Sequence, residues 1–277
     1  MSHDPVLLNE VLVGLNLKSG EAFLDATLNR GGHSIKLGEA LGESGHLIGI
    51  DADSKALAEA KENLSKLNCK KDFLLGNFRN LTSLLKNIGV NKIDAALFDL
   101  GLSSEQLAEG ERGFSFQLDG PLKMTLGRSI GDDTLTAEEI VNTWDEENLI
   151  TIIKNYGEET FANSIARAIV DARGKKEITT TFELVEVIKS AVPYWYQKRR
   201  IHFATKTFQA LRMTVNDELQ SLREGMISAF NLLSPKGRMA VISFHGLEAK
   251  TVKIFFKEKE VSGEGRQTPR KAIKPTR

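Results

Sequence analysis

The chain has 277 residues, of which 41% are hydrophobic and 27% are charged, with 37 basic and 37 acidic side chains. This composition is typical of a globular protein with a substantial core, and it excludes a strong overall field of either sign. A nucleic-acid partner would therefore have to be recognised through a local basic surface. Cys69 is the single cysteine, and the five histidines have no metal-ligand spacing, so we expect neither a disulfide nor a metal site.

The N-terminal residues 1–5 lack the basic region and long apolar stretch of a secretory signal. No apolar run approaches the roughly 18 to 20 residues that a membrane-spanning helix needs. We therefore expect a cytoplasmic protein with no membrane partner.

The first hundred residues alternate short apolar strands with helical segments. Strands are predicted at residues 22–28, 47–51, 73–75 and 93–100, with a helix from about Ser34 and another over 54–67. Strands that are separated by helices favour parallel pairing, and nearly continuous apolar strands are typical of a sheet covered on both faces. The fold class predicted is α/β, with a doubly wound and mostly parallel sheet.

The alternation stops after residue 104, and loops and helices follow. Thr136 and Thr180 each open a capping-box pattern, which predicts two helix starts. Apolar residues at helical spacing then predict one long helix over 208–233, and a last strand is expected at 239–244.

These elements predict an inserted domain. We expect a discontinuous sheet domain over residues 1–103 and 205–260, and an inserted helical domain for substrate recognition over 104–204. Residues 261–277 are predicted to form a flexible basic tail, since 265–277 hold basic side chains and no acidic ones.

A glycine turn follows the first strand, at Gly31 and Gly32, and Asp51 ends the second strand. Glycines at the carboxyl end of a first strand allow a ligand to approach the backbone, and an acid after the second strand can accept both hydroxyls of a ribose. An adenosine-bearing cofactor fits this pair. The missing GxGxxG disfavours a dinucleotide, although a nicotinamide-dependent oxidoreductase stays an alternative. S-adenosylmethionine has no phosphate, and Asp25 beside the glycines suits its cationic end.

Asp99 ends the fourth strand and is followed by the polar turn of Ser103 and Ser104. In a doubly wound sheet this turn faces the same crevice as the glycines. It could bind the cofactor on one side and a target base on the other. The alternative is that the two serines merely start a helix.

A set of short segments stands in order across nearly the whole chain: His3–Glu10, Arg30–Ser34, Gly49–Asp53, Leu97–Ser104, Glu111–Phe116, Tyr156–Glu159, Arg167–Val170, Thr205–Arg212, Val215–Leu219 and Ile242–His245. Together they resemble the bacterial small-subunit (16S) ribosomal RNA cytosine-N4 methyltransferases. The resemblance implies an S-adenosylmethionine-dependent methyltransferase domain with an inserted helical domain. It also implies the product, an N4-methylated cytidine in the decoding region.

The resemblance implies roles for individual residues. Cofactor contacts fall on Gly31, Gly32, His33, Asp51, Phe78, Asp99 and Gln106.

An amine such as cytosine N4 is a poor nucleophile, and acceptors that hold its hydrogens can activate it. Asp99 and Ser103 are the expected catalytic residues, with His245 as a third candidate.

The chain departs from the family pattern at Asn29, where glycine is common, and at Lys123 and Gly246. The last two changes leave open a non-catalytic RNA-binding or ribosome-assembly protein that retains the fold.

The expected partner is small-subunit ribosomal RNA or the assembling small subunit. Residues 194–213 carry no acid and combine basic with aromatic side chains, which suit phosphates and unpaired bases. The basic residues are Lys198, Arg199, Arg200, Lys206 and Arg212, and the aromatic ones are Tyr194, Trp195, Tyr196, Phe203 and Phe208.

Overall fold

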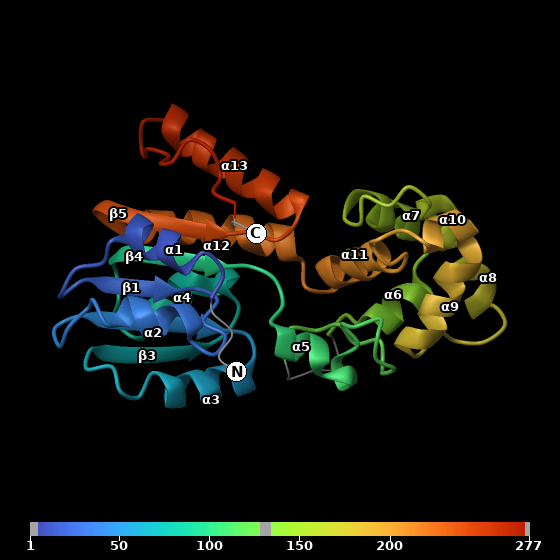
Figure 1. The fold of residues 1–277 in the computed structure, drawn as a ribbon, viewed down its shortest axis with the longest axis horizontal. Coiled ribbons are helices and arrows are strands. Elements are labelled where there is room, and N and C mark those ends of the chain that lie inside the picture. Colours follow the sequence, from blue (N-terminus) through green and yellow to red (C-terminus); the bar gives the residue numbers. More distant parts are fainter. Residues whose placement is uncertain (1–4, 128–133, 275–277) are drawn as a thin grey trace. The chain divides into compact units, whose positions relative to one another are not determined.

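The computed structural model describes residues 5–127 and 134–274. The chain divides into two compact units. The sheet unit comprises Met1–Gly101 and Leu219–Arg277, and the helical unit comprises Leu102–Glu218. Figure 1 shows the order of their elements along the chain. The first two residues of the His3–Glu10 segment and the last three of the basic tail lie outside the described residues.

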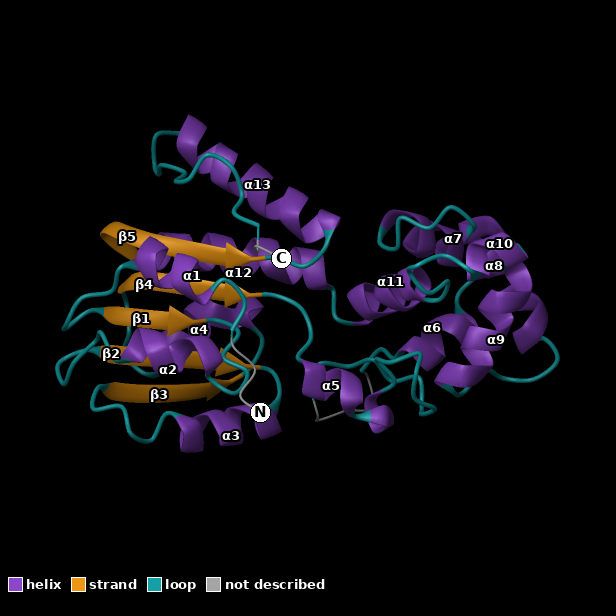
Figure 2. Cartoon of the chain, in the orientation of Figure 1, coloured by secondary structure: helices purple, strands orange, loops and turns teal. Residues whose placement is uncertain are grey.

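The sheet unit is built on a parallel sheet whose strand order, in the part of the chain described, is β3-β2-β1-β4-β5. Figure 2 shows the strands as arrows that point the same way. This confirms the predicted doubly wound α/β fold. The order reverses direction between β1 and β4, so the crevice for a ligand lies at the carboxyl ends of these two strands. The strands are β1 (Ala22–Asp25), β2 (His46–Asp51), β3 (Lys70–Leu75), β4 (Ile93–Asp99) and β5 (Leu233–Ile242).

Successive strand residues point to opposite sides of the sheet, so both faces carry apolar side chains. Helices cover both faces. On β1, Phe23 belongs to the hydrophobic core beneath one set of helices, and Leu24 to the core beneath the other. The first set is α1 (Leu8–Leu15), α2 (Gly32–Gly38) and α3 (Ser54–Asn63). The second set is α4 (Leu81–Asn87), α12 (Glu218–Leu232) and α13 (Gly246–Val261).

The helical unit has its own hydrophobic core. Thr136 and Thr180 accept hydrogen bonds from backbone amides as the N-caps of α6 and α9, so both predicted helix starts are confirmed. The helices of this unit are α5 (Ser104–Ala108), α6 (Ala137–Thr143), α7 (Glu146–Asn155), α8 (Ala162–Arg173), α9 (Thr181–Ala191), α10 (Tyr194–Gln197) and α11 (Thr205–Val215).

The prediction of one helix over residues 208–233 is wrong. α11 ends at Val215, and α12 begins at Glu218 after Asp217, which has a left-handed backbone with φ 45°. The apolar spacing continues across the break, but the two halves serve different cores. Phe208 packs in the core of the helical unit, whereas Met226 packs against the sheet. α11 thus lies in the helical unit, and that unit extends past the predicted boundary at residue 204.

Strand bounds also differ at the ends. β1 stops at Asp25 rather than at residue 28, because the next residues turn into the glycine loop. β5 starts at Leu233, earlier than expected, and ends at Ile242. No helix in the described ranges is long and apolar enough to cross a membrane.

A buried hydrogen bond anchors the short helix α10. The Tyr196 hydroxyl donates to Oε2 of Glu159 over 2.7 Å, and both side chains are buried. Burial and the neighbouring carboxylate raise the pKa of Tyr196 to about 12, so its hydroxyl remains a donor at neutral pH. Oε1 of Glu159 accepts the amide of Phe161 over 2.8 Å.

We expect Tyr196→Phe to destabilise the protein by about 1.5 to 3 kcal/mol, because it leaves a buried carboxylate oxygen without its donor. The measurement is the midpoint of urea unfolding. Tyr194→Phe is the matched control, since Tyr194 is 71% exposed and should lose little stability. Equal midpoints for the two variants would show that the buried bond contributes nothing.

Candidate active site

Three carboxylates lie at the carboxyl ends of neighbouring parallel strands. Asp25 ends β1, Asp51 ends β2 and Asp99 ends β4. Because β2 and β4 flank β1, these ends lie at one edge of the sheet. The structure thus places the acids at the predicted crevice.

Backbone amides fix the orientation of the Asp51 carboxylate. Oδ2 accepts the amide of Asn29 over 2.7 Å, and Oδ1 accepts the amide of Asp53 over 2.8 Å. Asn29 has a φ of 47°, and asparagine tolerates this left-handed conformation better than most residues. The departure from glycine at Asn29 is therefore compatible with the loop.

The two glycines of the turn have little room for a side chain. Gly31 has a φ of 81°, and a Cβ there would lie 2.9 Å from Leu64. A Cβ on Gly32 would lie 3.2 Å from Pro5. The backbone of this turn can therefore pack closely against its own neighbours in the chain, and its approach to a cofactor stays a prediction.

Asp25, His33 and Asp99 form a mostly buried cluster at the ends of β1 and β4. The Ser34 hydroxyl donates to Oδ2 of Asp25 over 2.6 Å. Burial raises the pKa of Asp25 to about 6, although the bond from Ser34 and the nearby His33 oppose the shift. Nδ1 of His33 lies 3.3 Å from Oδ2 of Asp99, and its Nε2 lies 2.9 Å from the Val6 carbonyl oxygen.

Asp99 is held at its backbone and at one carboxylate oxygen. Its amide donates to Oγ1 of Thr27 over 2.6 Å, and Oδ2 faces His33. Oδ1 is buried and has no hydrogen-bond partner among the described residues. A buried acceptor of this kind is costly unless a donor satisfies it. The ammonium group of S-adenosylmethionine or the amine of a target base would supply such a donor, so the cluster fits a cationic cofactor and an amine substrate.

Phe78 lies in the 3-10 turn η1 (Phe78–Asn80) after β3. Its ring packs edge-on against Phe98, with 5.6 Å between the centroids and an interplanar angle of 79°. A Cβ on Gly225 of α12 would lie 2.7 Å from the ring, so Phe78 is also part of the core packing. Its contact with adenine stays a prediction.

Ser103 and Gln106 lie in the helical unit, where they cap α5. The Ser103 hydroxyl accepts the amide of Gln106 over 3.1 Å, and Oε1 of Gln106 accepts the amide of Ser103 over 3.0 Å. This is the helix-starting alternative that the sequence left open. The catalytic role of Ser103 and the cofactor role of Gln106 stay predictions.

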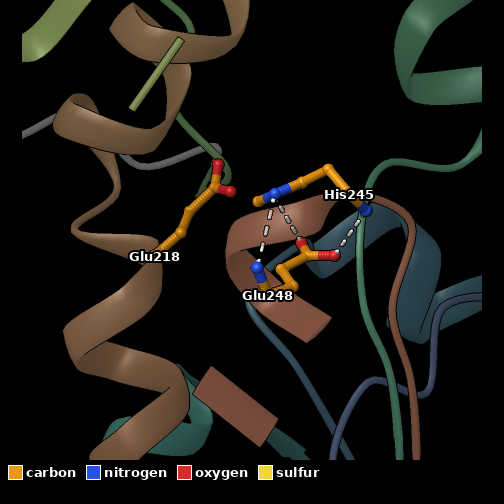
Figure 3. Close-up of side chains that lie close together, drawn as sticks. All are labelled: Glu218, His245 and Glu248. Atoms are coloured by element: carbon orange, nitrogen blue, oxygen red, sulfur yellow. Dashed lines mark hydrogen bonds and ion pairs between the residues drawn. The ribbon is translucent and has the colours of Figure 1, made fainter. Parts of the chain in front are cut away.

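His245, the third catalytic candidate, caps α13 (Figure 3). Its Nδ1 accepts the amide of Glu248 over 3.4 Å, and its Nε2 lies 3.0 Å from Oε1 of Glu248. Gly246 is the first residue of that helix. Figure 3 also draws Glu218, whose carboxylate pairs with Arg212 at 2.7 Å. These contacts give His245 a structural task, and its catalytic role stays a prediction.

The sequence did not single out Val6, Thr27 or Ser34 as partners of the cluster. Thr27 and Ser34 lie within four residues of the predicted glycine turn, so their hydroxyls were a usable signal. The contact of Val6 uses a backbone carbonyl, for which a sequence offers no residue-type signal.

A doubly wound parallel sheet with a glycine turn after β1 and acids ending β2 and β4 defines a Rossmann-like domain of the class that binds adenosine-bearing cofactors. The particular family follows from comparison with known proteins. Residues 1–273 match the MraW methylase family, and the chain belongs to this family. This confirms the resemblance, and it removes the nicotinamide-dependent oxidoreductase alternative.

Named relatives agree with this assignment. "Ribosomal RNA small subunit methyltransferase H" of Brevibacillus brevis is 43% identical over 256 residues, which are 92% of this chain and 81% of the relative. The protein of the same name from Mesoplasma florum is 45% identical with the same coverage. Among solved structures, NSun6 from Pyrococcus horikoshii is 12% identical and covers 91% of this chain and 41% of its own. Its TM-score of 0.43 is too low to support a conclusion.

Proposed function

We propose that this chain transfers a methyl group from S-adenosylmethionine to the exocyclic N4 of a cytidine in the decoding region of small-subunit (16S) ribosomal RNA. The observation that carries the proposal is the buried, unsatisfied Oδ1 of Asp99 at the crevice between β1 and β4. The name of the relatives supports RNA of the small subunit as the substrate. The proposed location is the cytoplasm.

The cofactor supplies, when bound, a sulfonium-linked methyl group that a nitrogen lone pair can displace in line. The protein contributes positioning and electrostatics. Asp51 would accept the ribose hydroxyls, with Gly31 and Gly32 allowing close approach, and the carboxylate of Asp25 would balance the cationic end. Asp99 is the alternative partner of that end, and cofactor titration of Asp99→Asn tests this alternative. His33, Phe78 and Gln106 are proposed as further cofactor contacts.

Asp99 would act on the target base. The lone pair of cytosine N4 is delocalised into the ring, so the amine needs an acceptor that holds one of its hydrogens. Oδ1 of Asp99 can accept this hydrogen and stabilise the positive charge that develops on nitrogen as the new N–C bond forms. It would also take the proton that the nitrogen then releases. Ser103 is proposed as a second acceptor near the amine, and the base must be unpaired to reach the site.

Several side chains of the expected RNA-binding stretch, residues 194–213, are buried or paired within the chain. Tyr196, Phe203 and Phe208 are buried in the core of the helical unit. Lys206 donates to the Glu158 carbonyl oxygen over 2.6 Å, and Arg212 pairs with an acid. The exposed side chains of the stretch lie within residues 194–201, and they are Tyr194, Trp195, Lys198, Arg199, Arg200 and Ile201.

Within this exposed stretch, aromatic rings lie beside cations. Trp195 is 60% exposed, with the Arg199 guanidinium 5.6 Å from its ring centroid, and Lys198 lies 5.1 Å from the ring of Tyr194. Arg200 is exposed as well. Rings of this kind stack on unpaired bases while the cations contact phosphates, so we propose residues 194–201 as an RNA-binding surface.

Arg199→Ala combined with Arg200→Ala should weaken binding to small-subunit RNA and lower its dependence on salt. Each lost phosphate contact reduces the slope of log affinity against log salt by about 0.7 to 0.9. Cofactor binding should not change. The double variant Lys61→Ala with Lys66→Ala removes the same charge from exposed positions of the sheet unit, and it should keep the parental slope. An unaltered slope in the arginine variant would assign residues 199 and 200 to a solvated loop.

The deciding experiment is a tritiated-methyl assay on small ribosomal subunits that lack the modification, with the labelled nucleoside identified by chromatography. We expect N4-methylcytidine. Label in another nucleoside would overturn the proposed position. No label, with RNA binding intact, would favour the non-catalytic assembly protein.

A further inference from the structure

We infer that His33 is a positioning residue: its protonated imidazole holds Oδ2 of Asp99 and thereby leaves Oδ1 as the oxygen that accepts the amine of the substrate. This inference rests on the proposed function for the identity of the amine. The contact between His33 and Asp99 lies wholly within the sheet unit.

The bonding partners of His33 determine where its protons are. Nε2 lies 2.9 Å from the carbonyl oxygen of Val6, and a carbonyl oxygen can only accept a hydrogen bond. Nε2 therefore carries a hydrogen. In the neutral ring Nδ1 would then be an acceptor, and it would face another acceptor, Oδ2 of Asp99, at 3.3 Å. A proton must lie between Nδ1 and Oδ2, which makes His33 a donor at both nitrogens.

The surroundings favour the charged ring. His33 is 4% exposed, and burial alone would lower the pKa of its imidazole. The hydrogen bond and charge of Asp99, the Val6 carbonyl and the charge of Asp25 outweigh burial and raise the pKa of His33 above its ordinary value. Among the residues that the structure describes, the acidic groups that face the ring are thus Asp25 on β1 and Asp99 on β4.

This arrangement separates the two oxygens of Asp99. Thr27 holds the backbone amide of Asp99, and His33 holds Oδ2, so the carboxylate has a fixed rotation. Oδ1 is the oxygen that His33 does not hold, and it is buried and without a hydrogen-bond partner among the described residues. A single oriented acceptor is what an amine needs in order to present its lone pair in line.

The first test needs no activity. In the full-length protein without cofactor, ¹⁵N spectra of the histidine rings should show that His33 keeps protons on both nitrogens to a higher pH than an ordinary histidine does. His33→Gln identifies the signal by its loss. Asp99→Asn should lower the pKa of His33, whereas Asp94→Asn, on the same strand, should not. A neutral ring with an unprotonated Nδ1, or a pKa that Asp99→Asn leaves unchanged, would overturn the inference.

The second test uses two amides that imitate different nitrogens of the ring. The amide nitrogen of His33→Asn can replace Nδ1 and donate to Asp99, whereas that of His33→Gln replaces Nε2 and reaches towards Val6. We expect His33→Gln to lower kcat by roughly ten- to a hundredfold, because misplacing a reacting group by about 1 Å can cost about 100-fold. A rise in the KM for cofactor in place of the fall in kcat would contradict the inference and would instead indicate the cofactor contact that is also proposed for His33. His33→Asn should retain most of kcat.

The pH dependence separates positioning from folding. In the parent, kcat should fall as pH rises through the raised pKa of His33, because the donor to Asp99 is lost. Asp25 has a pKa of about 6, so its titration would change kcat at a lower pH than the titration of His33 does. The alkaline fall should vanish in His33→Asn, whose amide does not titrate. If it persists there, or if His33→Gln keeps the parental kcat, the inference fails while the proposed function stands.

A parent that transfers no methyl group to small-subunit RNA contradicts the proposed function instead, and the ¹⁵N result then decides the His33 contact by itself.

Discussion

Asp51→Ala should bind S-adenosylmethionine at least about 100-fold more weakly than the parent. A hydrogen bond to a charged acceptor is worth about 1.5 to 3 kcal/mol, so the loss of both ribose hydroxyl bonds costs roughly 3 to 6 kcal/mol. Each 1.4 kcal/mol corresponds to about tenfold in affinity. Calorimetric titration of the cofactor measures this change directly.

The Asp51 carboxylate also accepts the backbone amides of Asn29 and Asp53, so its removal disturbs the loop as well as the ligand. Asp94→Ala is the matched control, because Asp94 accepts the amide of Ala22 over 2.9 Å at the opposite end of the same sheet. It should lose a comparable backbone bond and keep its cofactor affinity. If Asp51→Ala binds as the parent does, Asp51 is not the ribose acid.

The parts of the fold that follow from local sequence could be predicted. The places of β1 to β4 along the chain follow from apolar runs between helical segments. The N-caps at Thr136 and Thr180 follow from side chains that lie three residues from the amides they accept. The break between α11 and α12 could not be predicted from spacing. Apolar periodicity records which side chains are buried, but it does not record that Phe208 and Met226 are buried in different cores.

The candidate site shows the same division. Asp51 and the glycine turn were predictable because each lies at a strand end, where the fold class fixes its place. The partners of His33 were not, since Val6 and Asp99 are distant in sequence and meet through the packing of α2 on the sheet. Ser103 and Gln106 match both a capping box and the family pattern, so sequence alone could not separate structural from functional use.

Asp99→Asn should transfer methyl roughly 10² to 10⁴ times more slowly, the range typical of a positioned acid–base group, yet bind S-adenosylmethionine within a few-fold of the parent. Asparagine keeps one acceptor oxygen, removes the charge and adds two donors. Because His33 donates from Nδ1, the amide oxygen should turn towards His33. The new NH₂ group then takes the place of Oδ1 and faces the amine as a second donor.

Cofactor titration and a single-turnover methylation rate on the same preparation distinguish the possible roles of Asp99. A group that acts in the transition state alone affects turnover and not ground-state binding. A fall in both quantities together would make Asp99 a cofactor ligand. Asp94→Asn controls for the loss of one aspartate charge from β4. Parental turnover in Asp99→Asn would reject both roles, and the amine would then have to be held by Ser103 or His245.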